Sequence, residues 1–212
     1  DPSALRRDAL SVVTILLETD TDFNVAGGLQ LAAQRMPVKV SPESLAETAD
    51  FVQRRLEGVL RDEYDLPHDV VQAVLVERGH NPWLALTAAR DLAAATHQSH
   101  WEETLNAYAR CVRLVRGIDQ RYSVQPERFI EPVEKGLYTA YQQARASLTP
   151  GSSMAAVVDA LHEMLVAPIN AFFEDVLVMA DDEAVRQNRL ALLQDIRDLT
   201  SGYADFSQLK GF

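Results

Sequence analysis

The sequence predicts an all-α protein of 212 residues. Apolar residues recur with the 3.6-residue period of a helix along nearly the whole chain. No segment shows the convincing apolar–polar alternation of a β-strand. Residues typical of helix starts and stops separate the periodic segments. These observations favour a bundle of helices. Helices are expected at 4–18, 20–36, 42–63, 66–79, 83–98, 100–116, 126–148, 154–180 and 182–199.

Local signals mark the helix starts. Ser41 is a good N-cap, and Pro42 fits the first helical position after it. Asn81-Pro82 opens a further helix, and Ser99 is expected to cap the one that follows. Each start therefore has a residue that can satisfy free backbone N–H groups.

Glycine and proline mark the interruptions. Gly79 and Gly117 are expected to end the helices before them. Gly27-Gly28 weakens the second helix, and Pro168 predicts a kink inside the helix at 154–180. Asp181 is expected to cap the last long helix.

Composition excludes several classes of protein. The chain has no apolar run judged long enough to span a bilayer, and DPSALRRDALSVV at its start is not patterned as a signal peptide. The absence of an initiator Met leads us to expect a piece of a longer protein. Cys111 is the only cysteine, so an internal disulfide is impossible and a reducing, cytoplasm-like compartment is expected.

Positive charge is concentrated in one segment of an acidic chain. The net charge is −11, but residues 108–128 hold five arginines against two acids, a local net of +3. Two readings stay open: arginines on a solvated face, or arginines that bind RNA phosphates while tyrosines stack on unpaired bases. The candidate RNA-binding residues are Arg110, Arg113, Arg116, Arg121, Tyr108 and Tyr122.

Catalytic and metal-binding patterns are incomplete. His97, His100 and Glu103 straddle a helix break, and His68-Asp69 lacks further ligands. The run that begins at Asp20 fails the calcium-loop spacing. Cys111 lies among apolar helical residues and is expected in the core. We therefore predict no catalytic residues and no metal, and expect a binding module.

Arg189 lies in an apolar helix stripe and needs a partner, because an unpaired buried charge is costly. Glu174 or Asp175, at the end of the preceding helix, is the expected partner, with RNA contact as the alternative. Asp182 is expected to pair with Arg186 at i, i+4.

Two consecutive stretches carry a family resemblance: PINAFFEDVLVM (168–179) and, after an acidic corner, RQNRLALL (186–193). The order and spacing of these residues resemble the C-terminal region of the bacterial and plastid-type glycyl-tRNA synthetase beta subunit. DPSALRR (1–7) and ADFSQL (204–209) resemble two further elements of that family. The run 109–114 departs from the usual K-R-V-x-N-[IL] and is similar to plastid-like and single-chain members, so a separate beta subunit and a fused chain both stay open.

The resemblance implies a fold and a function. Residues 1–39 would be the last helices of an HD-like domain, and 40–212 an anticodon-binding helical domain like that of arginyl-tRNA synthetases. The chain would bind tRNA(Gly) for a glycine–tRNA ligase whose catalytic site, with ATP and Mg, lies in a separate or fused alpha part. The resemblance implies a cytoplasmic or plastid protein without membrane contact. A helical protein–protein interaction scaffold is the alternative.

Overall fold

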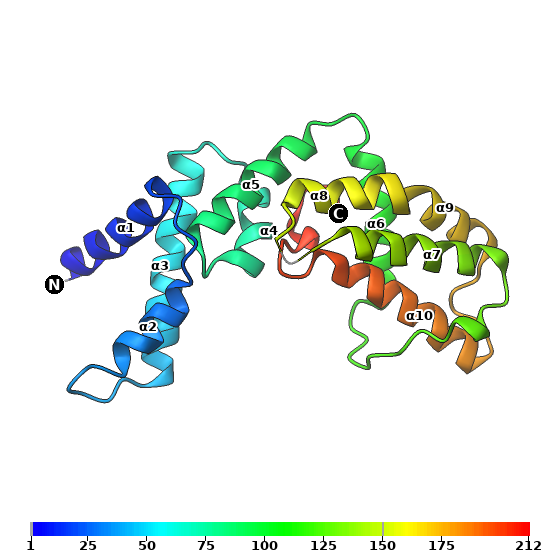
Figure 1. Ribbon diagram of the computed structural model, residues 1–212, viewed down its shortest axis with the longest axis horizontal. Coiled ribbons are helices and arrows are strands. Elements are labelled where there is room, and N and C mark those ends of the chain that lie inside the picture. The colour runs from blue at the N-terminus through cyan, green and yellow to red at the C-terminus, as the bar shows by residue number, and fades with distance from the viewer. Residues whose placement is uncertain (1, 150) are drawn as a thin grey trace. The chain divides into compact units, whose positions relative to one another are not determined.

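The computed structural model describes residues 2–149 and 151–212, which form helices and connections without a β-strand (Figure 1). This confirms the predicted all-α class. Two residues of predicted features, Asp1 at the first helix start and Pro150 in the loop at 149–153, lie outside the described residues.

The chain forms two compact units. Unit 1 comprises Asp1–Ala93 with Gly202–Leu209, and unit 2 comprises Ala94–Ser201 with Lys210–Phe212. The boundary predicted near residue 40 lies inside unit 1. It concerns the limit of a family domain rather than a compact unit, and it stays a prediction.

Unit 1 is built around the helix α3. Its helices are α1 (Pro2–Glu18), α2 (Val25–Ala33), α3 (Pro42–Asp62), α4 (His68–Arg78) and most of α5 (Pro82–Thr96). Helices α1, α2 and α4 pack against α3, whose Leu56 and Leu60 are fully buried. Ser41 Oγ accepts a 3.2 Å hydrogen bond from Ser44 N, which confirms the predicted cap.

Unit 2 is a bundle of long helices. Its elements are α6 (Trp101–Val115), η1 (Pro126–Arg128), α7 (Pro132–Ser147), α8 (Met154–Ala160), η2 (Leu161–Leu165), α9 (Val166–Asp175), α10 (Glu183–Arg197) and η3 (Asp198–Thr200). Helices α9 and α10 each pack against α6 and α7 (Figure 1). Phe172, Leu192 and Leu137 are fully buried in the core that results.

A kink is expected at Pro168, and the structure shows a change of helix type in the turn that precedes it. Residues Leu161–Leu165 form a π-helical turn, η2, that joins α8 to α9. Proline lacks an N–H, and its ring clashes with the carbonyl of the residue four positions earlier. A wider turn just before Pro168 accommodates both defects while the helix continues.

Several predicted helix limits differ from the structure, and two of these differences are at helix starts. The helix expected at 126–148 begins at Pro132, because Pro132 occupies the first position behind a capping box formed by Glu131 and Glu134. The cap of α10 is Asp182, not Asp181, since its carboxylate accepts hydrogen bonds from Ala184 N and Val185 N. The one-residue shift of the α10 cap is usual for helix ends.

One described helix is long and apolar enough to cross a membrane by length and composition, contrary to the expectation of no such run: Met154–Asp175. Within unit 2 it packs against α6 and α7, and Leu165, Ile169 and Phe172 on it are buried. A core helix passes the same test of length and composition. We therefore interpret this segment as the core helix of unit 2.

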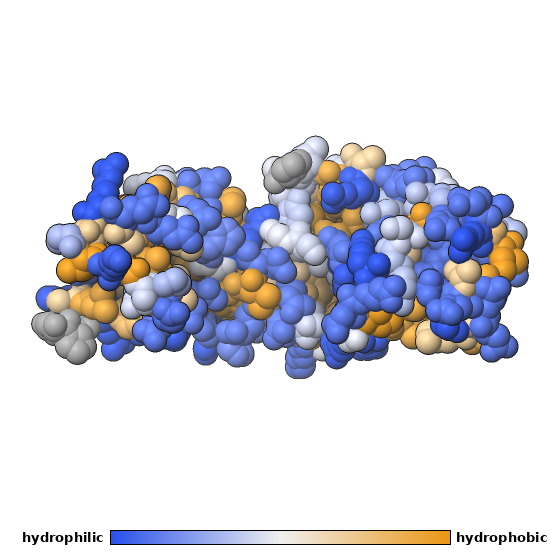
Figure 2. All heavy atoms as spheres, turned by 90° about the horizontal axis from the view of Figure 1, so that it is seen from below, coloured by the Kyte–Doolittle hydropathy of each residue, from blue (hydrophilic) through white to orange (hydrophobic). Residues whose placement is uncertain are grey.

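Apolar side chains are scattered over the visible surface. Figure 2 shows a face that is mainly hydrophilic, with apolar residues in small separate patches. Isolated exposed apolar residues are normal for folded proteins. This face therefore gives no evidence of a large apolar docking surface.

Candidate nucleic-acid interface

Helix α6 separates a buried face from an arginine face. Leu105, Cys111 and Val115 are buried on one side, whereas Arg113 and Arg116 are exposed at the C-terminal end. The guanidinium carbons of the two arginines lie 5.5 and 5.9 Å from the centre of the Phe212 ring. The aromatic ring holds the two cations on one surface without neutralising them.

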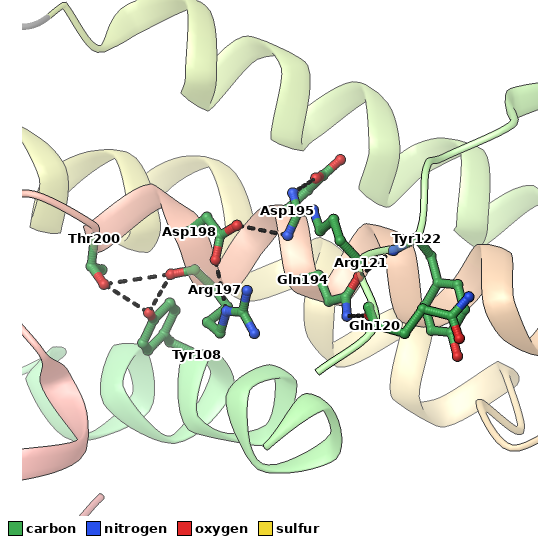
Figure 3. A network of polar contacts seen from close by, with 9 residues as sticks. All are labelled: Tyr108, Gln120, Arg121, Tyr122, Gln194, Asp195, Arg197, Asp198 and Thr200. Carbon is green, nitrogen blue, oxygen red and sulfur yellow. Dashed lines mark hydrogen bonds and ion pairs between the residues drawn. The ribbon is translucent and has the colours of Figure 1, made fainter. Parts of the chain in front are cut away.

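Tyr108 belongs to the buried face, so its predicted stacking on RNA bases is corrected. It is 3% exposed, and its hydroxyl donates a 2.7 Å hydrogen bond to the Arg197 carbonyl oxygen. The Tyr108 hydroxyl oxygen also lies 2.8 Å from Thr200 Oγ1 (Figure 3). Its position three residues after Leu105 already places it on the apolar stripe. Tyr108 ties α6 to the end of α10.

Arg110 is partly engaged in packing. Its guanidinium carbon lies 4.3 Å from the centre of the Phe173 ring, and Nη1 donates to Asn170 Oδ1 at 3.1 Å. Both partners are on α9. Arg110 thus holds α6 against α9, and less of its guanidinium is available to a ligand than at Arg113.

Arg121 has two carboxylate partners in unit 2. Its guanidinium pairs with Asp198 at 2.6 Å and also with Asp195 (Figure 3). Burial raises the pKa of Asp195, and this effect outweighs the opposite effect of the Arg121 charge. Because its charge is compensated, Arg121 fixes the connection between α6 and α7 rather than presenting a free cation.

Two buried amides of α10 fix the same connection. Asn188 Oδ1 accepts from Gln125 N at 2.7 Å, and Asn188 Nδ2 donates to the Gln125 carbonyl at 3.1 Å. Gln194 Oε1 accepts from Tyr122 N at 3.0 Å, while Gln194 Nε2 donates to the carbonyl of residue 120 at 2.8 Å (Figure 3). The connection is therefore held to α10 through its backbone, whatever side chains it carries.

The fixed connection leaves a polar hollow of ≈ 260 Å³ against α10, called here the loop hollow. It is lined by Arg121, Tyr122, Ser123, Gln125, Arg128, Ala184, Gln187 and Asn188. The Arg128 side chain is exposed and makes no hydrogen bond or ion pair within residues 2–149 and 151–212. Tyr122 and the unpaired cation of Arg128 thus both line the loop hollow, and sites for single-stranded RNA combine an aromatic ring with positive charge in this way.

Arg189 is buried and paired, but its partner differs from the prediction. Its Nε donates to Glu134 Oε1 at 2.8 Å, and its Nη1 donates to the Leu177 carbonyl oxygen at 2.8 Å. Glu174 and Asp175 are both exposed instead. Spacing along the chain could not identify Glu134, because it lies 55 residues away in sequence.

Glu134 is an interior acceptor for three donors. Besides Arg189, its other oxygen accepts from Ile130 N at 2.8 Å and Glu131 N at 2.6 Å. Burial acts to raise the pKa of Glu134, but the hydrogen bonds from Arg189 and the two backbone groups outweigh it, and the pKa lies below its usual value. The carboxylate is therefore held ionised at the start of α7.

Asp182 and Arg186 do not form the expected pair. Asp182 caps α10, and Arg186 Nη1 donates to the Ala180 carbonyl oxygen at 2.8 Å. The cap uses the Asp182 carboxylate locally, which leaves Arg186 free to bind the connection before α10. A backbone carbonyl has replaced the carboxylate that the i, i+4 spacing suggested.

Other candidate residues have structural surroundings. Cys111 is fully buried, and desolvation raises its pKa to about 12, which confirms the predicted core role. His100 stacks on His162 with ring centres 3.8 Å apart. His68 is exposed, 3.9 Å from Glu57. Within the described parts of the chain, no group of three His, Cys, Asp or Glu could hold a metal ion.

Two family models match the chain. The model described as glycyl-tRNA synthetase beta subunit matches residues 1–76, and the one described as DALR anticodon binding domain matches residues 104–202. The second range coincides with the helices of unit 2 that carry Arg113, Arg116 and the loop hollow. The chain is therefore similar to tRNA synthetase chains in its first part and to a helical anticodon-binding domain in its second.

Curated relatives agree over the whole chain. The chloroplastic/mitochondrial glycine–tRNA ligase 2 of Arabidopsis thaliana is 37% identical over 100% of this chain and 20% of its own length. The glycine–tRNA ligase beta subunit of Moorella thermoacetica is 38% identical over 99% of this chain and 31% of its own length. The beta subunit of Bacillus subtilis is 31% identical over 99% and 30%, respectively.

The chain belongs to the glycyl-tRNA synthetase beta subunit family and corresponds to a C-terminal region of its relatives. It spans between about a fifth and a third of the length of the relatives it matches.

Proposed function

We propose that unit 2 binds the anticodon region of tRNA(Gly) within a glycine–tRNA ligase. The observation that carries this proposal is the match of the anticodon-binding model to residues 104–202. The exposed cations Arg113, Arg116 and Arg128 lie inside that range. Arginine donates to phosphate oxygens in a bidentate geometry, and its charge favours the RNA backbone.

The proposal extends to the parent enzyme. Attachment of glycine to tRNA takes place in an alpha part, carried by a separate subunit or fused in the same chain, and that part binds ATP and Mg. The alpha part is thus the protein partner of this region. The parent works in the cytoplasm or in a plastid, without membrane contact. In support, one relative is a chloroplastic/mitochondrial glycine–tRNA ligase and another is the beta subunit of a glycine–tRNA ligase.

The test is binding of fluorescently labelled tRNA(Gly) to the 212-residue chain, followed by anisotropy at several salt concentrations. The logarithm of the affinity should fall linearly with the logarithm of the salt concentration, by about 0.7 per single-stranded phosphate contact. A tRNA with a different anticodon should bind more weakly. Binding that is absent, or indifferent to both salt and anticodon, would support the alternative of a protein-binding helical scaffold.

A further inference from the structure

We propose that the loop hollow receives one unpaired nucleobase and favours a base that carries an exocyclic amino group. The inference rests on the proposed tRNA binding and names the residues that would read the RNA. Tyr122 provides the stacking surface, Arg128 provides hydrogen-bond donors, and Gln187 reads the base edge. Arg121, Asn188 and Gln194 are positioning residues.

The size of the loop hollow limits its occupant. Pockets for drug-sized ligands enclose about 300–1,000 Å³. The loop hollow, at ≈ 260 Å³, lies just below that range. It has room for one heterocycle but not for a run of stacked nucleotides. Sequence-specific RNA recognition usually involves such single splayed bases, which stack on aromatic or arginine side chains.

The loop hollow is held in shape before any ligand arrives. Asn188 is 3% exposed and Gln194 is 1% exposed, and both bind the backbone of the α6–α7 connection rather than its side chains. Arg121 adds the ion pairs to Asp195 and Asp198. A site that is already ordered does not lose this conformational freedom on binding. The positioning residues therefore hold the site in shape through these backbone hydrogen bonds and ion pairs.

The free donors and acceptors predict which base fits. Arg128 offers only donors, so it suits a ring nitrogen, a carbonyl oxygen or a phosphate oxygen. Gln187 Nε2 already donates to Glu183 Oε1 at 2.8 Å, which leaves the Gln187 carbonyl oxygen as an acceptor. That oxygen can pair with the amino group of cytosine, adenine or guanine. Uracil has no amino group and offers only its N3–H, which lies between two carbonyl oxygens that would repel the Gln187 oxygen. The loop hollow should therefore bind uracil more weakly than a base that carries an amino group.

The experiment uses the 212-residue chain and an anticodon stem-loop RNA in which each loop nucleotide in turn lacks its base. At one position, loss of the base should weaken wild-type binding about tenfold or more, the scale of one stacking contact. Tyr122→Ala should weaken binding to the intact RNA by a similar factor and remove the effect of that abasic position. Tyr122→Phe, which keeps the ring, should bind like the wild type.

Base choice is tested at the same position. Exchange of cytosine for uracil, or of the resident purine for its analogue without an amino group, should weaken wild-type binding about tenfold. Gln187→Ala should abolish this discrimination. Gln143→Ala, at an exposed glutamine on α7, is the matched control and should keep the discrimination.

The outcomes separate the two proposals. If the wild type binds the stem-loop but no abasic position couples to Tyr122→Ala, tRNA binding stands and the base site is overturned. Retained discrimination in Gln187→Ala overturns the assignment of Gln187 as the reader. If the wild type does not bind the intact stem-loop or tRNA(Gly), the proposed function fails, and this inference fails with it.

Discussion

Arg189 shows how an arginine can occupy the apolar face of a helix. It is 6% exposed, and its donors reach both Glu134 on α7 and the Leu177 carbonyl oxygen in the connection before α10. The need for a partner follows from the sequence alone, because an isolated buried charge is costly. The identity of the partner does not, since only the tertiary packing of α7 on α10 brings Glu134 within reach.

Arg189→Leu and Arg189→Ala should both destabilise the protein by about 3–5 kcal/mol, because each leaves the buried Glu134 carboxylate without its cation. The double variant Arg189→Leu, Glu134→Leu should recover part of this loss. Urea unfolding followed by circular dichroism measures the free energy of unfolding. Glu174→Gln, at an exposed acid, is the control and should have little effect. A stable Arg189→Leu would contradict the buried pair.

The lowered pKa of Glu134 predicts a pH dependence. A carboxyl whose folded pKa lies below its unfolded value, about 4.3, contributes stability above that value and loses it as the pH falls through the folded pKa. Glu134→Gln should therefore lower the free energy of unfolding more at about pH 7 than at about pH 3. Asp195, whose pKa is raised, contributes with the opposite sign but is present in both proteins. A difference that is constant with pH would contradict the ionised state of Glu134.

At the scale of elements, α10 organises both of its neighbouring connections. Arg186 and Arg189 bind carbonyl oxygens of the connection before α10, and Asn188 binds the backbone of the α6–α7 connection. The stretch RQNR (186–189) therefore holds both connections against α10 through hydrogen bonds. The sequence suggested structural ion pairs there, but it could not show that backbone groups would be the partners, because connections lack a period from which contacts can be inferred.

The sequence is enough to predict that these helices exist, but not the residues at which each one begins and ends. The 3.6-residue period predicts α3, α6 and α10 because their core-facing residues repeat regularly. The end of α9 was placed too late, since the apolar residues of 176–180 continue the pattern although the chain there is not helical. Burial of Tyr108 could have been predicted from its place on the α6 stripe, whereas the paired state of Arg121 depends on acids 74 and 77 residues away.

Two glycines in unit 2 test backbone effects in opposite directions. A Cβ added at Gly136 or at Gly117 would meet no atom within 4 Å. Gly136 lies inside α7, so Gly136→Ala should raise the free energy of unfolding by about 0.5–1 kcal/mol. Gly117 has φ +76°, so Gly117→Ala should lower it by about 1–2 kcal/mol. Thermal melts of the two variants should shift in opposite directions, and shifts of the same sign would contradict these conformations.

At the scale of the whole molecule, the chain is expected to bind and not to catalyse. The sequence shows no complete catalytic pattern, and His68 is an exposed residue beside Glu57. The purified chain should therefore show no aminoacylation, ATP–pyrophosphate exchange or phosphohydrolase activity on its own. The measurement is product formation with radiolabelled glycine, pyrophosphate or nucleotide. Turnover above background that disappears in His68→Ala would contradict this prediction.

In this acidic chain, the arginines without a carboxylate partner are expected to contribute to RNA binding, and the paired arginines to folding. The net charge is −11, so non-specific attraction to RNA is weak, and affinity must come from locally uncompensated cations. Arg121 is compensated by two acids, whereas Arg113 and Arg116 contact the Phe212 ring and are exposed. Loss of these two cations should therefore lower the affinity for RNA much more than the free energy of unfolding.

Arg113→Ala with Arg116→Ala should weaken tRNA(Gly) binding several-fold and reduce the slope of log affinity against log salt by about 1.4, if each arginine contributes one single-stranded phosphate contact. Helical content and melting temperature should stay close to the wild-type values, because exposed charges contribute little to folding. Arg61→Ala with Arg35→Ala removes the same charge from unit 1 and is the matched control. An equal loss of affinity in the control pair would show that only total charge matters. An unchanged affinity in the test pair would show that Arg113 and Arg116 are solvated and do not contact the tRNA.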